Sequence, residues 1–454
     1  AADKFKEHGK NVGVIASPRL TNEAVFSLKK FATDASGSGN YAVSDASDVS
    51  AVFDNLSAPL CTHREIRHAA TIVLIGGEPE EEQSYTAKQI RQAVRNGGAK
   101  FICINDTPIN LSRRATQFVH VNPGTVDAFA LGFVDESSDA KIAEKCGVDA
   151  GVIESAGKII EETQGDLIIM VGSDLSSEAQ ALIAASAGNL AGEGRRVLLH
   201  PLAKYNNSVG AHDATAGRKT VDEVVKSSKA LLIGGSLQDA SVLAGKDFVV
   251  VQELFQTETT DHADVVFPAA SFAEVDGTFT NNAGNVQRVR QAIEPVHQAK
   301  PDWMITSLIA KEMGTPITAE LSASAIFRSI ADAVPAYEGL RYPSLKDESS
   351  PVQAKYALVS GKDMSAEISA VKSWLDSVSA GGEKNTTVPK VGHKLHRLTT
   401  MTSKTQQFHL LAHGNPKPAN LLVSPLAQFG LDGSPREDSV AATVGVSDRS
   451  APGK

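Results

Sequence analysis

This chain of 454 residues is poor in cysteine and in aromatic side chains. Its three cysteines, Cys61, Cys103 and Cys146, are far apart in sequence and form no C-x-x-C pair. A disulfide framework or an iron–sulfur cluster needs several thiols at close spacing. We therefore expect reduced thiols, no iron–sulfur cluster and no metal-binding residue in this sequence.

Long apolar runs and basic tracts are also missing. No apolar run approaches the about 20 residues that cross a bilayer. Lys and Arg number 44 against 53 Asp and Glu, which gives a formal net charge of -9. A nucleic-acid partner would favour a basic tract, so none is expected. We expect no direct membrane insertion, and a cytoplasmic chain that is peripheral to the inner membrane only through partners.

What the sequence has is a repeated unit of aliphatic strand, glycine turn and helix. Hydrophobic residues make up 42% and aromatic residues 5%, a mixture that suits the buried strands of parallel sheets. The alternation predicts an α/β protein with doubly wound, mostly parallel sheets. The expected strands cover 11–16, 70–76, 100–105, 166–172, 196–200, 230–235, 247–252 and 263–268, with helices over 21–31 and 178–187.

The length favours two or three domains. We predict a first α/β lobe over residues 1–140 and a second over 141–345, with the boundary near the acidic segment 135–139. Residues 346–454 are more polar and poorer in aliphatic runs. For this extension we predict one helix over 365–377, a linker over 381–386 and otherwise extended or poorly ordered chain.

Glycines stand at three predicted strand ends, where Gly76 and Gly77, Gly172, and Gly234 and Gly235 occur. Glycine at such an end lets the backbone approach a phosphate, because ligands of open α/β sheets lie beyond the carboxyl ends of strands. The alternative is that these turns need glycine for their own geometry. No G-x-G-x-x-G or P-loop is present, so no NAD or ATP site is predicted.

Three segments carry a resemblance to a known family. They are Ser17–Glu23 (SPRLTNE), Thr257–Thr259 (TET) and Asp276–Asn281 (DGTFTN). Together with the order of strands over roughly residues 10–345, they resemble the molybdopterin oxidoreductase family. The resemblance implies that the TET and DGTFTN loops lie near a cofactor channel, where hydroxyls and amides bind a pterin. The same residue types also cap helices and fix long loops.

Two positions depart from the family pattern. Glu78 stands where the family normally has asparagine, and a carboxylate there would repel a pyrophosphate. Asn105-Asp106-Thr107 replaces the usual Asp-Pro-Arg, which leaves Asp106 as the candidate ribose acceptor. The resemblance thus implies a vestigial cofactor site without catalytic residues. Its members are Gly76, Gly77, Asp106, Gly172, Gly234, Thr257, Glu258, Thr259, Asp276, Thr278 and Asn281.

Within this family we expect the branch of the large iron–sulfur subunit of NADH-quinone oxidoreductase (respiratory complex I). The region would then be a scaffold without molybdenum in electron transfer from NADH to quinone. Iron–sulfur clusters would lie in N-terminal domains outside this sequence, and peripheral-arm subunits would be the partners. The alternative is a fragment of a molybdopterin guanine dinucleotide enzyme such as formate dehydrogenase. A third possibility is a free-standing module that binds a small anion or nucleotide.

Overall fold

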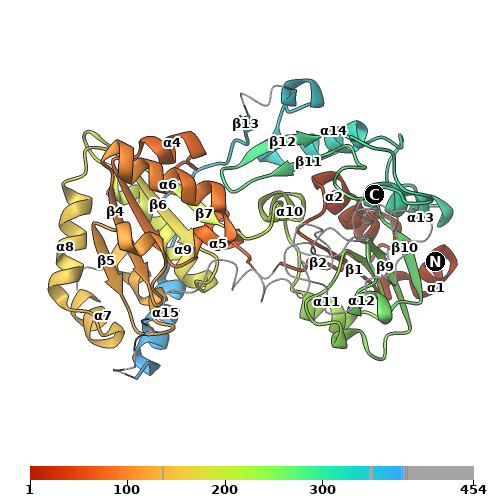
Figure 1. Ribbon diagram of the computed structural model, residues 1–454. Coiled ribbons are helices and arrows are strands. Elements are labelled where there is room, and N and C mark those ends of the chain that lie inside the picture. The colour runs from red at the N-terminus through yellow and green to blue at the C-terminus, as the bar shows by residue number, and fades with distance from the viewer. Residues whose placement is uncertain are drawn as a thin grey trace, which may run out of the picture.

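The computed structural model describes residues 1–45, 47–134, 138–346 and 351–379, together with residues 381, 384 and 386. These residues form two α/β lobes side by side, each built on a five-stranded parallel sheet (Figure 1). The two lobes are named here the sheet A lobe and the sheet B lobe. The predicted fold class, α/β with parallel sheets, is confirmed.

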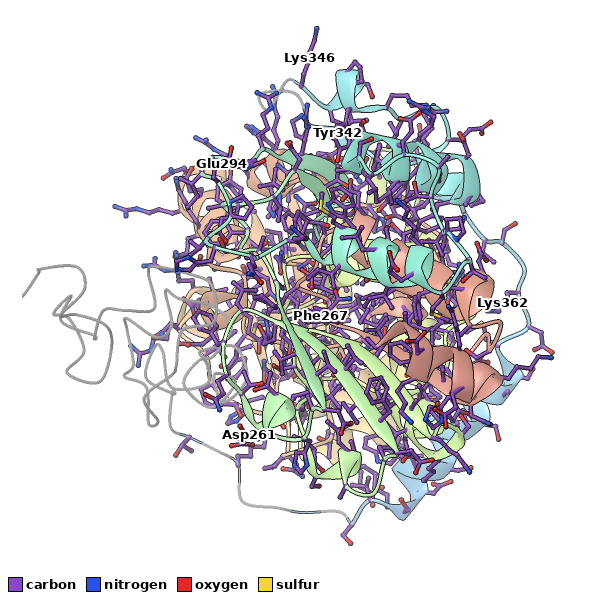
Figure 2. All side chains as sticks on the ribbon, turned by 90° about the vertical axis from the view of Figure 1, so that its right-hand side faces the viewer. Asp261, Phe267, Glu294, Tyr342, Lys346 and Lys362 are labelled. Atoms are coloured by element: carbon purple, nitrogen blue, oxygen red, sulfur yellow. The ribbon has the colours of Figure 1, made fainter. Side chains whose placement is uncertain are left out.

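Sheet A has the strand order β10-β9-β8-β1-β2. Apolar side chains project from both faces of its central strands, so helices cover each face. One face packs against α2, α13 and α14, and the other packs against α11. Figure 2 looks onto this lobe, with Phe267 of β10 near the middle. The elements are β1 (Val12–Ala16), β2 (Tyr41–Val43), β8 (Ala230–Gly234), β9 (Phe248–Glu253), β10 (Val265–Pro268), α1 (Ala2–His8), α2 (Asn22–Lys30), α10 (Ser208–Ala214), α11 (Val221–Ser227), α12 (Glu258–Asp261), α13 (Asp302–Glu312) and α14 (Ala323–Ala333).

Sheet B has the order β5-β4-β3-β6-β7. In β3, Ile72 and Leu74 face the cluster under α4 and α6, whereas Val73 and Ile75 face the cluster under α9. Burial on both faces explains why the strand reads as a continuous aliphatic run. The elements are β3 (Thr71–Ile75), β4 (Lys100–Asn105), β5 (Gln117–His120), β6 (Gly165–Gly172), β7 (Arg195–Leu202), α3 (Ser50–Phe53), α4 (His63–His68), α5 (Pro79–Glu82), α6 (Ser84–Gly97), η3 (Leu111–Arg114), η4 (Val126–Phe133), α7 (Asp139–Cys146), α8 (Ala150–Glu161) and α9 (Ser177–Ser186).

The order of the strands differs from the predicted division of the chain at residues 140 and 141. That division falls inside sheet B, because β3 pairs in parallel with β6, with Ile72 opposite Ile168. Sheet A is discontinuous in sequence, because β1 pairs with β8, with Val12 opposite Ala230. The sheet B lobe is therefore inserted between β2 and β8. Periodicity along the chain locates strands but carries no information about their neighbours.

Residues 351–379 connect the two lobes. A small antiparallel sheet joins β11 (Gly277–Thr280), β12 (Asn285–Val289) and β13 (Val352–Gln353) beside the sheet A lobe. The chain then reaches α15 (Ser365–Ser377), whose Val371 and Leu375 are buried in the sheet B lobe. The bounds of α15 agree with the predicted helix. The linker prediction over 381–386 and the rest of the predicted extension lie largely or wholly outside the described residues.

Candidate functional site

Each sheet has one switch point, a pair of neighbouring strands from which the chain continues toward opposite edges of the sheet. In sheet A this point lies between β1 and β8, and in sheet B it lies between β3 and β6. Open α/β sheets bind ligands beyond the carboxyl ends of the strands at such points. The two candidate positions are called here the sheet A cleft and the sheet B turn.

The sheet B turn contains three of the glycines predicted from the sequence. Gly76 and Gly77 have φ of +67° and +73°, which side chains rarely adopt. Asp174, which follows β6, accepts a hydrogen bond from the Gly77 N–H through Oδ2 at 3.0 Å. A Cβ on Gly172 would lie 2.2 Å from Asp174 Oδ1 and 2.7 Å from Gly77 N. The close approach of the two strand ends is therefore sufficient to explain the glycines, and no ligand is needed to explain them.

The Gly77 N–H of this turn already has a carboxylate acceptor, Asp174, and two further acids lie nearby. Glu78 is buried beside it. Asp106, the candidate ribose acceptor, accepts from Gly124 N–H at 2.8 Å and from Thr107 Oγ1 at 3.0 Å. A phosphate at the Gly77 N–H would displace Asp174 and meet its negative charge. The sheet B turn thus does not fit a pyrophosphate. The sequence pointed to an acid at this turn through Glu78, but the acid that takes the backbone donor is Asp174.

The sheet A cleft is a cavity of about 490 Å³ at the carboxyl ends of β1, β8 and β9. Arg19, just after β1, lines it. Among the described residues, the buried Nε and Nη2 atoms of Arg19 have no hydrogen-bond partner. The guanidinium carbon lies 4.8 Å from the centre of the Tyr205 ring. Burial lowers the pKa of Arg19, but a guanidinium stays charged at any physiological pH. Unused guanidinium donors in a cleft suit an anionic ligand.

Two buried acids line the same cleft. Glu253 accepts from Ser236 Oγ at 2.6 Å and from Leu254 N–H at 2.7 Å, and burial raises its pKa. Burial also raises the pKa of Asp302 to about 8. Asp302 is therefore protonated near neutral pH and available as a donor. The cleft is less negative than its residue types imply. Sequence reasoning did not single out Arg19 as a site residue, although it lies in the SPRLTNE motif directly after a strand.

The TET motif lies next to this cleft but not in it. Thr257 caps α12, and its Oγ1 is 2.9 Å from Ser236 Oγ. Thr259 Oγ1 accepts from Leu237 N–H at 2.9 Å, whereas Glu258 is exposed. Among the described residues that line the cleft, none comes from this motif. The two threonines tie the loop after β9 to the loop after β8. Their predicted contact with a cofactor stays a prediction.

The SPRLTNE and DGTFTN motifs bind each other. Glu23 accepts from the N–H and the Oγ1 of Thr278, at 2.8 and 2.9 Å. Asn22 Nδ2 donates to Thr278 Oγ1 at 3.0 Å and to Thr280 Oγ1 at 3.1 Å. Both motifs therefore fasten the β11–β12 hairpin onto α2.

The remaining predicted residues also have structural partners. Asn281 Oδ1 accepts from the N–H groups of Ala283 and Asn285, each at 3.0 Å, and so forms the hairpin turn. Asp276 accepts from Arg288 at 3.3 Å. A Cβ on Gly234 would lie 2.6 Å from Leu28 Cδ1. These contacts explain the residue types in structural terms, and a role in cofactor binding stays a prediction for all three.

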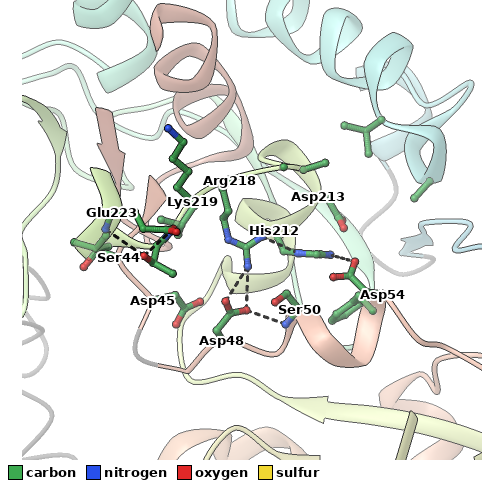
Figure 3. Close-up of a pocket in the computed structure, with 18 of the residues that line it drawn as sticks. Ser44, Asp45, Asp48, Ser50, Asp54, His212, Asp213, Arg218, Lys219 and Glu223 are labelled. Carbon is green, nitrogen blue, oxygen red and sulfur yellow. Dashed lines mark hydrogen bonds and ion pairs between the residues drawn. The ribbon is translucent and has the colours of Figure 1, made fainter. Parts of the chain in front are cut away.

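A larger cavity of about 1020 Å³ lies where the two lobes meet (Figure 3). Nη2 of Arg218 donates to both carboxylate oxygens of Asp48, at 3.0 and 2.9 Å. Nη1 of Arg218 donates to His212 Nδ1 at 2.9 Å, and His212 Nε2 lies 3.5 Å from Asp54. Burial first, and then Arg218, lowers the pKa of His212. Because these side chains bind one another, we interpret them as contacts that join the two lobes and not as a ligand-binding site.

The three cysteines have no chemical role in either candidate position. Each is free and buried, and burial raises the pKa of each thiol. Buried thiols with raised pKa are poor nucleophiles. They serve as small core side chains of the sheet B lobe.

Two parallel sheets, one of them with a cleft at its switch point, define the class as a two-lobed α/β protein. Residues 1–312 match the model of the family described as molybdopterin oxidoreductase, and the chain belongs to this family. The resemblance inferred from the motifs is confirmed at this level. Among the described residues, every helix is too short or too polar to cross a bilayer.

The relatives favour one branch. The chain is 28% identical to the F420-dependent formate dehydrogenase subunit alpha of Methanocaldococcus jannaschii over 430 aligned residues, covering 76% of this chain and 63% of the relative. It is 46% identical over 104 residues to the F420-dependent formate dehydrogenase 2 subunit alpha of Methanococcus maripaludis, covering 23% of this chain and 15% of the relative. The chain thus spans less than two thirds of these relatives. They support the formate dehydrogenase alternative better than the expected complex I subunit.

Among solved structures, the acetylene hydratase of Pelobacter acetylenicus has a similar fold, with a TM-score of 0.57. The likeness covers 79% of this chain and 62% of that one. Sequence identity is 14%, so this likeness concerns the fold alone.

Proposed function

We propose that this chain is the molybdopterin-fold region of a formate-dehydrogenase-like oxidoreductase. We further propose that the sheet A cleft holds an anionic cofactor of the molybdopterin guanine dinucleotide class. The relatives named as formate dehydrogenases support the first statement. The second is carried by one observation, the buried Nε and Nη2 donors of Arg19 that lack a partner among the described residues.

The residues of the cleft have distinct parts in this proposal. Arg19 would bind a phosphate oxygen of the cofactor, because a charge-assisted hydrogen bond is the strongest contact available there. Gly235, with φ of +87°, keeps the turn after β8 close to the end of β1. Protonated Asp302 would donate to a polar edge of the pterin. When bound, the molybdenum centre would supply two-electron redox chemistry, and this chain would bind and orient it.

The scaffold function expected from the sequence stays the second candidate. It is favoured by the sheet B turn, where Asp174 accepts from Gly77 N–H at 3.0 Å. We therefore propose one cofactor, in the sheet A cleft, and no second cofactor at the sheet B turn. The name subunit alpha, printed for both relatives, supports at least one partner polypeptide. Peripheral-arm subunits of complex I are not supported by these relatives.

Guanosine diphosphate is a practical probe, because it carries the phosphates and the base of the proposed cofactor. Titration calorimetry should detect binding to the purified chain. Arg19→Met should weaken binding by about tenfold or more, since a hydrogen bond to a charged group contributes roughly 1.5–3 kcal/mol. The matched control is Arg328→Met, which removes an exposed arginine of the sheet A lobe away from the cleft.

Equal binding by the wild type and Arg19→Met would contradict the cofactor assignment. Circular dichroism of both variants checks that the fold is retained. Molybdenum and guanine analysis of the chain, purified from cells supplied with molybdate, separates the two candidates. Absence of both from the purified chain would favour the scaffold.

A further inference from the structure

One outer face of the sheet B lobe is strongly basic, in a chain whose net charge is -9. The face is formed by α4, α6, η3 and the first residue of β4, and it is called here the basic face. Glu65 is the one acid within these elements, and it forms an ion pair with Arg196 at 2.9 Å. The exposed cations of the basic face are Arg64, Arg67, Lys88, Arg95, Lys100, Arg113 and Arg114. Within the described part of the chain, no ion pair involves any of these seven.

Packing brings these elements together although they are scattered in sequence. Apolar residues of α4, α6 and η3 share one core cluster above sheet B, which turns their polar sides outward. Near one end, a Cβ on Gly97 of α6 would lie 3.7 Å from the carbonyl oxygen of Arg67 in α4. On the other side of α6, Glu80 accepts from both Arg91 at 3.0 Å and Leu111 N–H at 2.9 Å, which fixes η3. Figure 1 shows α4 beside α6.

Like charges at this density repel one another, and a ligand of opposite sign relieves that repulsion. Five of the seven cations are arginines, whose planar guanidinium matches a carboxylate. Tyr85, 56% exposed, lies on α6 with Lys88 Nζ 6.0 Å from its ring centre. Tyrosine and arginine are the residues that anchor protein–protein interfaces. Tyr85 is also the one large apolar residue that the described residues expose on this face, which leaves little to insert into a lipid layer.

We propose that the basic face is a docking surface for a protein that presents an acidic, carboxylate-rich patch. None of its cations lines the sheet A cleft, so the proposal does not depend on the cofactor assigned there. Electrostatic complementarity of this kind mainly speeds association and fixes orientation, and salt weakens it.

The probe is a short fluorescein-labelled polyglutamate peptide, followed by fluorescence anisotropy. The face variant is Arg64→Glu/Arg95→Glu/Arg114→Glu. The matched control is Lys229→Glu/Lys311→Glu/Arg328→Glu, three exposed cations of the sheet A lobe without ion pairs in the described residues. Both variants carry the same formal net charge. Thermal unfolding of each variant checks that the charge reversals leave it folded.

We expect the wild type and the control to bind polyglutamate, and the face variant to bind about tenfold or more weakly, with the difference shrinking as salt is added. Two competitors distinguish other anionic partners: vesicles of phosphatidylglycerol and phosphatidylcholine, and duplex DNA. The proposal is overturned if the wild type does not bind polyglutamate, or if the control loses as much affinity as the face variant. It is also overturned if vesicles or DNA bind more tightly than polyglutamate and require the same three arginines.

Discussion

Glu23 shows how a single buried acid supports the join between two distant motifs. It lies in α2 with no exposed surface, and it accepts hydrogen bonds from Thr278 and, at 2.9 Å, from Tyr342 Oη. Burial raises the pKa of Glu23 to about 7, against 4.5 for an ordinary glutamate. The hydrogen bonds from Thr278 and Tyr342 lower the pKa but do not cancel this shift. The acid is therefore near the middle of its titration at neutral pH.

The first prediction concerns the pH dependence of stability. Because the folded chain holds the Glu23 proton more tightly than the unfolded chain does, this contribution is complete below pH 4.5 and is lost as the pH rises to about 7. Glu23→Gln removes the titration. Between these pH values, the free energy of unfolding of the wild type should fall relative to Glu23→Gln by roughly 3 kcal/mol.

Urea unfolding at a series of pH values measures this difference. Exposed Glu320→Gln is the control, and it should follow the wild type throughout. A difference between Glu23→Gln and the wild type that stays constant across this range would show that Glu23 does not titrate as described.

At the scale of elements, the lobes are joined by side chains on short helices at their boundary. Asp48 and Asp54 flank α3, which packs against α9 of the sheet B lobe. His212 lies on α10, which packs against α2 of the sheet A lobe, and Arg218 follows it. The phenyl ring of Phe53 adds a contact of 5.1 Å, between ring centres, with Tyr356. Contacts between elements of different lobes thus set how the lobes meet.

The second prediction is a coupling energy between Arg218 and Asp48. The Arg218 side chain is 15% exposed and that of Asp48 is 50% exposed, so solvent screens the pair in part. A double-mutant cycle with Arg218→Ala and Asp48→Ala should give a coupling of about 1 kcal/mol, falling with added salt.

The comparison pair is Lys226 and Asp222, whose side chains are 74% and 70% exposed within one helix. Its coupling should be smaller, at most about 0.5 kcal/mol. Equal couplings for both pairs would mean that the contact between the lobes adds nothing beyond an ordinary surface ion pair.

At the scale of the whole molecule, the segment 351–379 is a second connection between the lobes, in addition to the contacts of Arg218 and His212. Its β13 pairs with β12, and its α15 is buried against the sheet B lobe. Leu375 has no exposed surface, whereas Leu358 in the intervening stretch is 53% exposed. A helix late in the sequence therefore completes a core whose strands end at residue 202.

The third prediction tests this distant dependence. Leu375→Ala should lower the free energy of unfolding by about 3 kcal/mol, because it removes apolar surface and leaves a cavity. Leu358→Ala should leave stability unchanged within about 0.5 kcal/mol. Chemical denaturation measures both, and hydrogen exchange in β6 and β7 should accelerate in Leu375→Ala alone. Unchanged exchange there would mean that α15 does not support the sheet B core.

The sequence by itself determined the fold class, the family and most of the elements. The bounds predicted for β4 and α15 agree with the structure, because burial on both faces of a strand and the period of a helix are local signals. The hydrogen-bonding capacity of the TET and DGTFTN motifs was equally visible in the residue types. Their cofactor contacts stay untested.

Tertiary structure alone decided which strands are neighbours and which polar groups find partners. It places Asp174 on the donor of Gly77, leaves two donors of Arg19 without a partner among the described residues, and gathers the cations of the basic face. The Asp174–Gly77 contact and the basic face each bring together residues that are tens of positions apart in sequence. Local periodicity ends within a strand or a helix, whereas pairing and electrostatics act wherever packing brings groups close together.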